Sequence, residues 1–212
     1  MIEFATMCVG KDWIFDWKDD ISNFYKLHKL HLLTDNKDWF DFETYNYKNK
    51  QFSYYDKLIF LLDVMSLNKK RITYLDVDKL HLYNNIDYDN SSCYVYNITK
   101  WPESLSATFK TVKSEIHDYL NTKDNSDIYA QEALISLPYS ADFENIKKDI
   151  MGLQSIIETT FHDRGGWETR KLNRYSKHGV GFGEGSALTA VLLKYNINIV
   201  NVYGSFRKET LI

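Results

Sequence analysis

A chain of 212 residues is long enough to bury one sizeable hydrophobic core, and we expect residues 1–212 to form a single domain. Its 44% hydrophobic and 16% aromatic residues exclude a disordered protein. The formal net charge of -3 argues against a duplex-binding protein, which normally presents a basic face, so no nucleic-acid partner is expected.

Cysteine content and the amino-terminal segment indicate the cell compartment in which the protein is expected. Cys8 and Cys93 are too few for a disulfide framework, which indicates a reducing compartment. Glu3, Lys11 and Asp12 interrupt the amino-terminal stretch, so it does not read as a signal peptide, and no apolar run is long enough to span a bilayer. We therefore expect a cytoplasmic protein without a membrane span, either a whole chain or one domain of a longer protein.

The first part of the chain alternates predicted strands with predicted helices. Strands are expected at residues 2–9, 30–34 and 71–75, and helices at 19–31 and 54–67. Gly10 follows the first strand, Asp35 the second, and Asp76 and Asp78 the third. Strands and helices in this order predict an α/β fold with a mostly parallel central sheet flanked by helices. Ligands of such sheets bind beyond the carboxyl ends of the strands, where these residues fall.

The second part of the chain continues with further strands and helices. We expect a strand at 92–98, a helix opened by Trp101-Pro102-Glu103, helices at 128–137 and 142–157, a glycine-rich stretch at 165–185, a helix at 186–194 and a strand at 197–202. The glycine-rich stretch contains Trp167 and Tyr175 and is a candidate lid over a bound ligand.

An acidic pair, Asp76 and Asp78, marks the end of the third predicted strand. Alternate residues of an extended segment point the same way, so both carboxylates are expected to converge on one ion. Two like charges that close need a cation or a raised pKa. The alternative, a polar strand end that caps a neighbouring helix, stays open. The same Asp-x-Asp pattern at residues 87–89 lies in a polar loop and is interpreted as loop only.

The segments around this pair resemble glycosyltransferases of family 8, the group of bacterial lipopolysaccharide galactosyl- and glucosyltransferases and of glycogenin. The matching blocks are Tyr55-Asp-Lys57-Leu58, Tyr74-Leu-Asp-Val-Asp78, Tyr96-Asn97-Ile-Thr-Lys100-Trp101, Tyr129-Ala-Gln131-Glu132-Ala-Leu134 and Lys177-His178-Gly-Val-Gly181. These blocks keep the order of the family and cover roughly residues 2–181. Small soluble enzymes of this layout also occur in large viruses, and the resemblance does not separate the two origins.

The resemblance implies a GT-A fold, which is Rossmann-like, and a hexosyltransferase that uses a nucleotide-sugar donor, most commonly a UDP-sugar, and a glycan or other hydroxyl acceptor. It implies that Asp78 is the main ligand of Mn²⁺ or Mg²⁺ and that Asp76 shares the ion and reaches the ribose. Carboxylate oxygens suit both ions, whereas an imidazole ligand favours Mn²⁺. His178 is the candidate imidazole, and His162 is its rival.

The remaining roles concern the donor and the acceptor. Lys57 is expected to contact the donor diphosphate, although a solvated lysine at a helix start is an equal alternative. Backbone groups of the segment from Thr6 to Val9, which includes Cys8, are expected to hold the base, with Asp35 nearby. Val77 lies between the two metal ligands and is counted with the substrate-binding segment.

Gln131 and Glu132 are the candidate catalytic residues. The resemblance implies that Gln131 lies beneath the anomeric carbon, where an amide supports retention of configuration because it is a poor base. Glu132, near the acceptor hydroxyl, is a candidate base of an inverting enzyme. A polar helix start is the alternative for both residues.

Two other functional classes remain open. The chain is alternatively a catalytically inactive nucleotide-sugar-binding module, or a metal-dependent phosphotransferase or hydrolase that uses Asp76 and Asp78. Phosphotransferases of the Asp-x-Asp-x-Thr type carry the pair after the first strand, whereas here it follows the third, with Leu80 at the threonine position.

Overall fold

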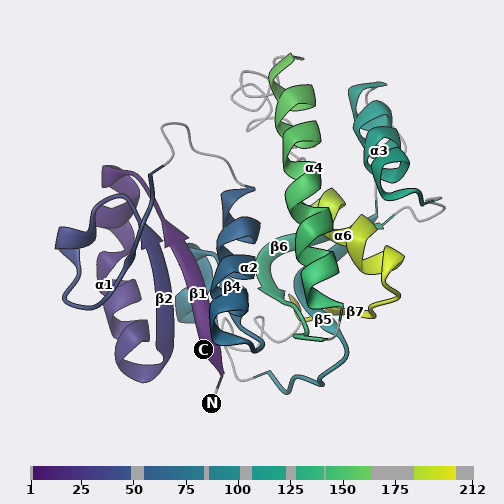
Figure 1. The fold of residues 1–212 in the computed structure, drawn as a ribbon. Coiled ribbons are helices and arrows are strands. Elements are labelled where there is room, and N and C mark those ends of the chain that lie inside the picture. The colour runs from purple at the N-terminus through teal and green to yellow at the C-terminus, as the bar shows by residue number, and fades with distance from the viewer. Residues whose placement is uncertain are drawn as a thin grey trace.

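The computed structural model describes residues 2–48, 55–83, 86–100, 107–122, 128–140, 142–163 and 184–203. In chain order the elements are β1 (Glu3–Cys8), α1 (Lys11–Leu27), β2 (Lys29–Thr34), the 3₁₀ helix η1 (Lys37–Trp39), β3 (Tyr45–Asn46), α2 (Asp56–Asn68), β4 (Thr73–Leu75), the 3₁₀ helix η2 (Val77–Leu82), β5 (Cys93–Lys100), α3 (Ala107–Leu120), β6 (Ile128–Ser136), α4 (Phe143–Asp163), α6 (Glu184–Lys194) and β7 (Ile199–Asn201). They form a mixed α/β fold around one seven-stranded sheet with the order β3-β2-β1-β4-β6-β5-β7 (Figure 1).

The sheet is mostly parallel, as predicted, with one exception. β1 pairs in parallel with β2 and β4, β2 with β3, and β5 with β7. Both antiparallel pairings involve β6, which lies between β4 and β5. The sheet is therefore mixed, and β6 runs opposite to all its neighbours.

The helix predicted at 128–137 is wrong, because these residues form β6. Their short apolar run, which includes Leu134 and Ile135, fits a buried strand as well as a helix by local pattern alone. Pairing decides the outcome: Leu134 lies opposite Leu75 of β4, and Ile135 lies opposite Tyr74 of β4 and Val95 of β5. These partners are far away in sequence, so local periodicity does not reveal them.

The other predicted elements are confirmed, with shifted ends. The largest shift is in α1, which begins at Lys11 and ends at Leu27 instead of covering 19–31. Its buried stripe starts at Ile14, ahead of Ile21 and Phe24, while the exposed Trp13 and Phe15 on either side obscure the pattern. The predicted helix opening at 101–103 and the glycine-rich stretch up to residue 183 lie outside the described residues.

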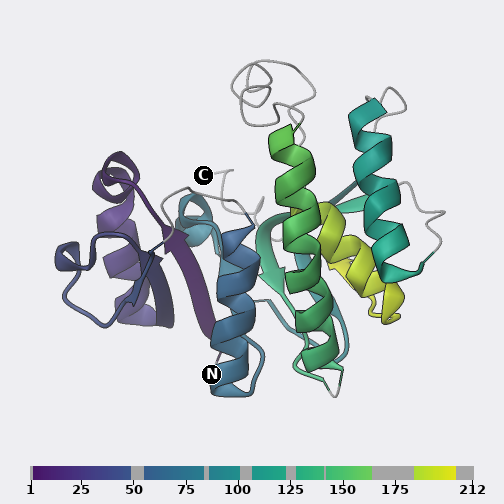
Figure 2. The ribbon, with the colours of Figure 1, turned by 45° about the horizontal axis from the view of Figure 1, so that its top comes forward.

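The sheet separates two hydrophobic cores. Along β1, Phe4 and Cys8 face one core together with residues of α1, whereas Ala5 and Met7 face the other core together with residues of α2, α4 and α6. Figure 2 shows α2 and α4 side by side, with α6 and α3 beyond them. No helix in the described part of the chain combines the length and apolar character that a bilayer crossing requires.

Candidate functional site

The carboxyl ends of β1, β2 and β4 meet at one edge of the sheet, and hydrogen bonds tie them together. The backbone N–H of Gly10, just after β1, donates to both carboxylate oxygens of Asp35, just after β2, at 3.0 and 3.2 Å. Thr6 Oγ1 donates to the carbonyl oxygen of Leu75 in β4 at 2.7 Å. Gly10 adopts φ 97°, a left-handed conformation that favours glycine, so the chain turns sharply there into α1.

Asp76 and Asp78 follow β4 at this edge. The prediction that both lie in one extended segment is wrong, because the extended backbone ends at Asp76. Asp76 has extended backbone angles, and its N–H donates to the carbonyl oxygen of Ala133 in β6 at 2.8 Å. Its own carbonyl oxygen accepts from the N–H of Lys79 at 2.8 Å, and η2 begins at Val77. A 3₁₀ helix turns by a third of a circle per residue, so the alternation on which the predicted convergence depended does not apply to Asp78.

Each carboxylate of the acidic pair lies beside a lysine. Asp76 Oδ1 is 3.7 Å from Lys57 Nζ, and Asp78 Oδ2 is 2.7 Å from Lys79 Nζ. Burial lowers the pKa of Lys79, but the hydrogen bond to Asp78 and the charges of Asp78 and Asp76 outweigh burial and raise it. Lys79 therefore stays protonated and connects the two carboxylates electrostatically. We call Lys57, Asp76, Asp78 and Lys79 the carboxyl-edge cluster.

Lys57 is positioned by the first turn of α2. Its side chain is only 6% exposed, and its Nζ lies 5.9 Å from the centre of the Tyr74 ring. Neighbouring residues fix this turn on both sides: Tyr47 Oη donates to Asp56, and Tyr55 Oη donates to the carbonyl oxygen of Ile150 in α4. The amino end of a helix carries a partial positive charge, which adds to that of the lysine at this edge.

The predicted catalytic residues reach the same edge through β6. Because β6 is antiparallel, its amino-terminal half extends beyond the end of β4, past the bond between Ala133 and Asp76. Gln131 lies there, half-buried, opposite Asn97 of β5. Glu132 follows on the same strand. Both residues were predicted at a helix start but lie on a strand, and the side chain of Glu132 is outside what the structure describes.

The predicted base-binding segment is mostly inside the sheet. Thr6 and Cys8 are buried, and burial, with a smaller effect of the Asp35 charge, raises the pKa of the Cys8 thiol to about 12. The thiol therefore keeps its proton at neutral pH. Val9 is partly exposed and Asp35 is exposed, so a ligand at this edge meets them first. Val77 is buried and packs in the core of α1.

The predicted imidazole ligand lies outside what the structure describes. His178 falls in the segment 164–183, and the side chain of His162 near the end of α4 is likewise not described. Within the described residues there is no group of three or more His, Cys, Asp or Glu side chains that could hold a metal ion. Among the described residues, Asp76 and Asp78 therefore have no third side chain of these types that would complete such a group.

Lys79 is the functional candidate that sequence reasoning missed. It directly follows Asp78, and it lies three residues after Asp76, the spacing at which residues of a 3₁₀ helix face the same side. Its Nζ also lies 5.8 Å from the centre of the Tyr96 ring of β5. The spacing was a usable signal, but only once η2 was known to replace an extended segment.

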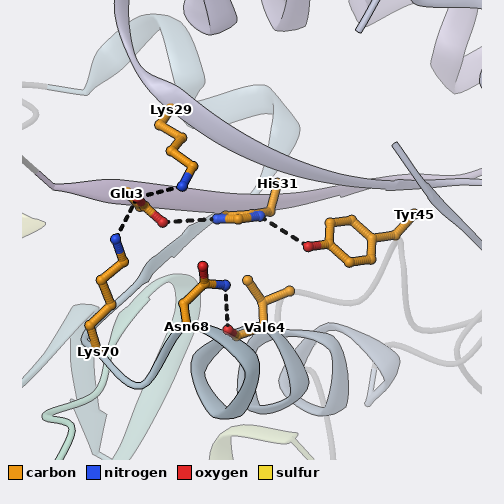
Figure 3. A network of polar contacts seen from close by, with 7 residues as sticks. All are labelled: Glu3, Lys29, His31, Tyr45, Val64, Asn68 and Lys70. Atoms are coloured by element: carbon orange, nitrogen blue, oxygen red, sulfur yellow. Dashed lines mark hydrogen bonds and ion pairs between the residues drawn. The ribbon is translucent and has the colours of Figure 1, made fainter. Parts of the chain in front are cut away.

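A second charged cluster lies at the opposite, amino edge of the same strands (Figure 3). Glu3 accepts hydrogen bonds from Lys29 at 2.8 Å, Lys70 at 2.5 Å and His31 Nε2 at 3.1 Å, while His31 Nδ1 is 3.3 Å from Tyr45 Oη. Burial raises the pKa of Glu3, but the three hydrogen bonds outweigh it and lower the pKa from 4.5 to about 2. We call these five residues the amino-edge cluster.

The comparisons with known proteins leave the resemblance to family 8 as a prediction. No protein-family model matches the chain, and no curated protein sequence matches it significantly. The geometry of the carboxyl-edge cluster therefore carries the functional proposal.

Proposed function

We propose that this chain is a metal-dependent glycosyltransferase with a GT-A fold, which transfers a sugar from a nucleotide-sugar donor, a UDP-sugar, to a hydroxyl group of a glycan acceptor. One observation carries the proposal: two carboxylates and two lysines gather where the carboxyl ends of β1, β2 and β4 meet, beside the residues of β6 that precede Ala133. This is the edge at which open α/β sheets bind nucleotides.

The cationic groups of the cluster suit the departing nucleoside diphosphate. Cleavage of the sugar–phosphate bond leaves negative charge on the diphosphate, and fixed positive groups stabilise that charge as it develops. Lys57 is buried and held by the first turn of α2, so little reorganisation is needed when a phosphate arrives. The partial positive charge at the amino end of α2 acts in the same direction.

Asp76 and Asp78 are the residues that would hold Mn²⁺ or Mg²⁺. Carboxylate oxygens are ligands that both ions accept, and such ions are commonly held by one or two carboxylates together with substrate phosphates. When bound, the ion neutralises charge on the diphosphate. His178 would add a nitrogen ligand from the segment outside the described residues. In the absence of an ion, the two lysines balance the two carboxylates.

The donor base is assigned to the segment after β1 and the turn after β2. Val9 and Gly10 offer backbone groups at the edge, and Asp35 is exposed beside them. Thr6 and Cys8 support this segment from inside the sheet, since Thr6 bonds to Leu75 and Cys8 lies in the core.

Gln131 supports transfer with retention of configuration. Its amide is a poor base, so it does not activate an acceptor for attack from the opposite face, but it stabilises positive charge on the sugar ring. Proton NMR of the first product formed from an α-linked donor tests this assignment. An α-linked product is expected. A β-linked product would mean inversion, with Glu132 as the base.

A panel of nucleotide sugars and nucleotides with Mn²⁺, read by thermal shift and followed by a transfer assay, tests the whole proposal. Stabilisation by nucleotide sugars of one base, together with turnover, is the expected result. Binding without turnover would identify an inactive nucleotide-sugar-binding module. Hydrolysis of simple phosphate esters without nucleotide-sugar binding would identify a phosphotransferase or hydrolase that uses Asp76 and Asp78.

A further inference from the structure

Lys79 makes the most direct contact in the carboxyl-edge cluster. Its Nζ lies 2.7 Å from Asp78 Oδ2, the length of a strong charge-assisted hydrogen bond, whereas Lys57 is 3.7 Å from Asp76. The side chain of Lys79 is 22% exposed and that of Asp78 is 40% exposed. The contact is therefore tight but open to solvent, so a ligand is able to displace the ammonium group.

The backbone holds Lys79 at the site independently of this contact. Its N–H donates to the carbonyl oxygen of Asp76 at 2.8 Å and closes the first turn of η2. The Nζ atom at the end of its side chain lies 5.8 Å from the centre of the Tyr96 ring. When the ammonium leaves Asp78, only the end of a flexible side chain moves, and the backbone of Asp76 to Lys79 keeps its place.

A divalent ion and the Lys79 ammonium compete for the carboxylate of Asp78. Metal ligation by Asp78 uses the carboxylate that now accepts from Lys79, and an ammonium group 2.7 Å from that carboxylate repels an incoming cation. Once displaced, the ammonium lies at the edge to which the donor diphosphate is assigned. A flexible lysine acts there as a point charge toward phosphate oxygens.

We infer that Lys79 is an exchangeable counter-ion, which neutralises Asp78 when no metal ion is bound, yields that carboxylate to the divalent ion, and then binds the nucleoside diphosphate. The inference rests on the proposed function, since it names a further donor-binding residue of the same site. It predicts opposite effects of one substitution on two ligands: Mn²⁺ alone binds more tightly without Lys79, and UDP with Mn²⁺ binds more weakly.

Two Lys79 variants and one matched control test the exchange. Lys79→Met removes the charge but keeps most of the side chain against Tyr96, and Lys79→Arg keeps the charge. Lys147→Met is the control, because Lys147 pairs with Asp63 at 3.0 Å with a similar exposure of 19%, in a contact between α2 and α4 away from the carboxyl-edge cluster. Free Mn²⁺ is measured by electron paramagnetic resonance without nucleotide, and UDP binding by calorimetry with saturating Mn²⁺.

Lys79→Met is expected to bind Mn²⁺ alone at least fivefold more tightly than the wild type and UDP with Mn²⁺ about tenfold more weakly, a loss of about 1.4 kcal/mol. Lys79→Arg and Lys147→Met are expected to stay within twofold of the wild type for Mn²⁺ alone. A role in packing alone would not tighten metal binding.

Unchanged or weaker Mn²⁺ binding by Lys79→Met would overturn the exchange, as would undetectable Mn²⁺ binding by every variant. Tighter Mn²⁺ binding with unchanged UDP affinity would overturn the transfer of Lys79 to the diphosphate. If the wild type binds Mn²⁺ but no nucleotide, the proposed function fails, whereas the comparison with Mn²⁺ alone still decides whether Lys79 is a counter-ion of Asp78.

Discussion

The two charged clusters at opposite ends of the parallel strands are built from similar groups but differ in the exposure of their carboxylates. The amino-edge cluster is the closed one, and the carboxyl-edge cluster is the open one. In the amino-edge cluster, Glu3 is 7% exposed and accepts from three side chains. In the carboxyl-edge cluster, Asp76 and Asp78 are 32% and 40% exposed, and each lies beside a lysine. A buried carboxylate that loses its partners is costly, whereas an exposed one is solvated by water. The closed cluster therefore stabilises the fold, and the open one remains accessible to ligands.

The largest expected effect is on activity, at the open cluster. Asp78→Asn removes one charge and one strong metal ligand, so we expect sugar transfer to fall on the order of 10²–10³-fold. Metal-dependent donor affinity should fall at least about tenfold, or about 1.4 kcal/mol, in calorimetry with UDP and Mn²⁺. The free energy of unfolding should change by less than about 0.5 kcal/mol, because the side chain is partly exposed.

Asp63→Asn is the matched control, since Asp63 also pairs with a lysine on the surface, Lys147. It should leave UDP binding unchanged. A calorimetric titration of Asp78→Asn that coincides with that of the wild type would remove Asp78 from the metal site.

The same kind of substitution at the closed cluster should act on stability. Glu3→Gln removes the charge of a nearly buried carboxylate that accepts hydrogen bonds from Lys29, Lys70 and His31, so we expect the free energy of unfolding to fall by about 2 kcal/mol in urea denaturation. Donor affinity should not change. Glu144→Gln, at an exposed position beside Ser66, is the control and should have little effect. A stability loss at Asp78 larger than at Glu3 would break the distinction between the clusters.

The closed cluster should also give the protein a pH dependence of stability. The pKa of Glu3 is about 2 in the folded chain and 4.5 as its ordinary value, so the unfolded chain binds more protons between these pH values. Stability from this group is complete above about pH 4.5 and is lost as pH falls toward 2. The pKa difference corresponds to at most about 3 kcal/mol, and screening at the exposed Lys29 reduces it to about 2 kcal/mol.

Urea denaturation of the wild type and Glu3→Gln at several pH values measures the contribution of the Glu3 charge to the free energy of unfolding. The difference between the two proteins cancels the titration of other groups. The stability advantage of the wild type should shrink from pH 5 to pH 2. An advantage that stays constant over this range would show that Glu3 stabilises the strands through shape and not through charge.

The smallest expected effect concerns a third ligand of the open cluster. His178→Ala should weaken the support of transfer by Mn²⁺ about fivefold and that by Mg²⁺ less, because a nitrogen ligand matters more to the softer ion. Metal titrations of the transfer reaction measure both. If His162→Ala abolishes Mn²⁺ support while His178→Ala changes neither titration, the ligand is His162.

The carboxyl ends of the parallel strands were predictable because a run of apolar residues and the polar or glycine residue that ends it are neighbours in sequence. Buried apolar runs stop at Gly10, Asp35 and Asp76, and the rule that ligands bind at such strand ends predicts that these residues share one edge of the sheet. The bond from Gly10 to Asp35 and the bond from Asp76 to Ala133 connect segments that the rule assigns to this edge, although the second partner was expected on a helix.

Long-range pairing explains what the sequence did not reveal. β6 looks helical by local pattern, and only β4 and β5 make it a strand. Likewise, Glu3 and Lys70 are 67 positions apart, so the amino-edge cluster has no local signature. The direction of Asp78 depended on a 3₁₀ turn that starts at Val77, and a simple alternation rule overlooks such a turn.

The reversed strand β6 has a consequence for the order of folding during synthesis. By residue 83 the chain has supplied β1 to β4, whose pairings with one another are all parallel, and one side of β4 stays unpaired until β6 is made. An open strand edge in a nascent chain is a site for pairing with other chains. A ribosome that stalls before residue 128 would therefore present Thr73–Leu75 as an aggregation-prone edge, whereas emergence of residue 136 allows that edge to close.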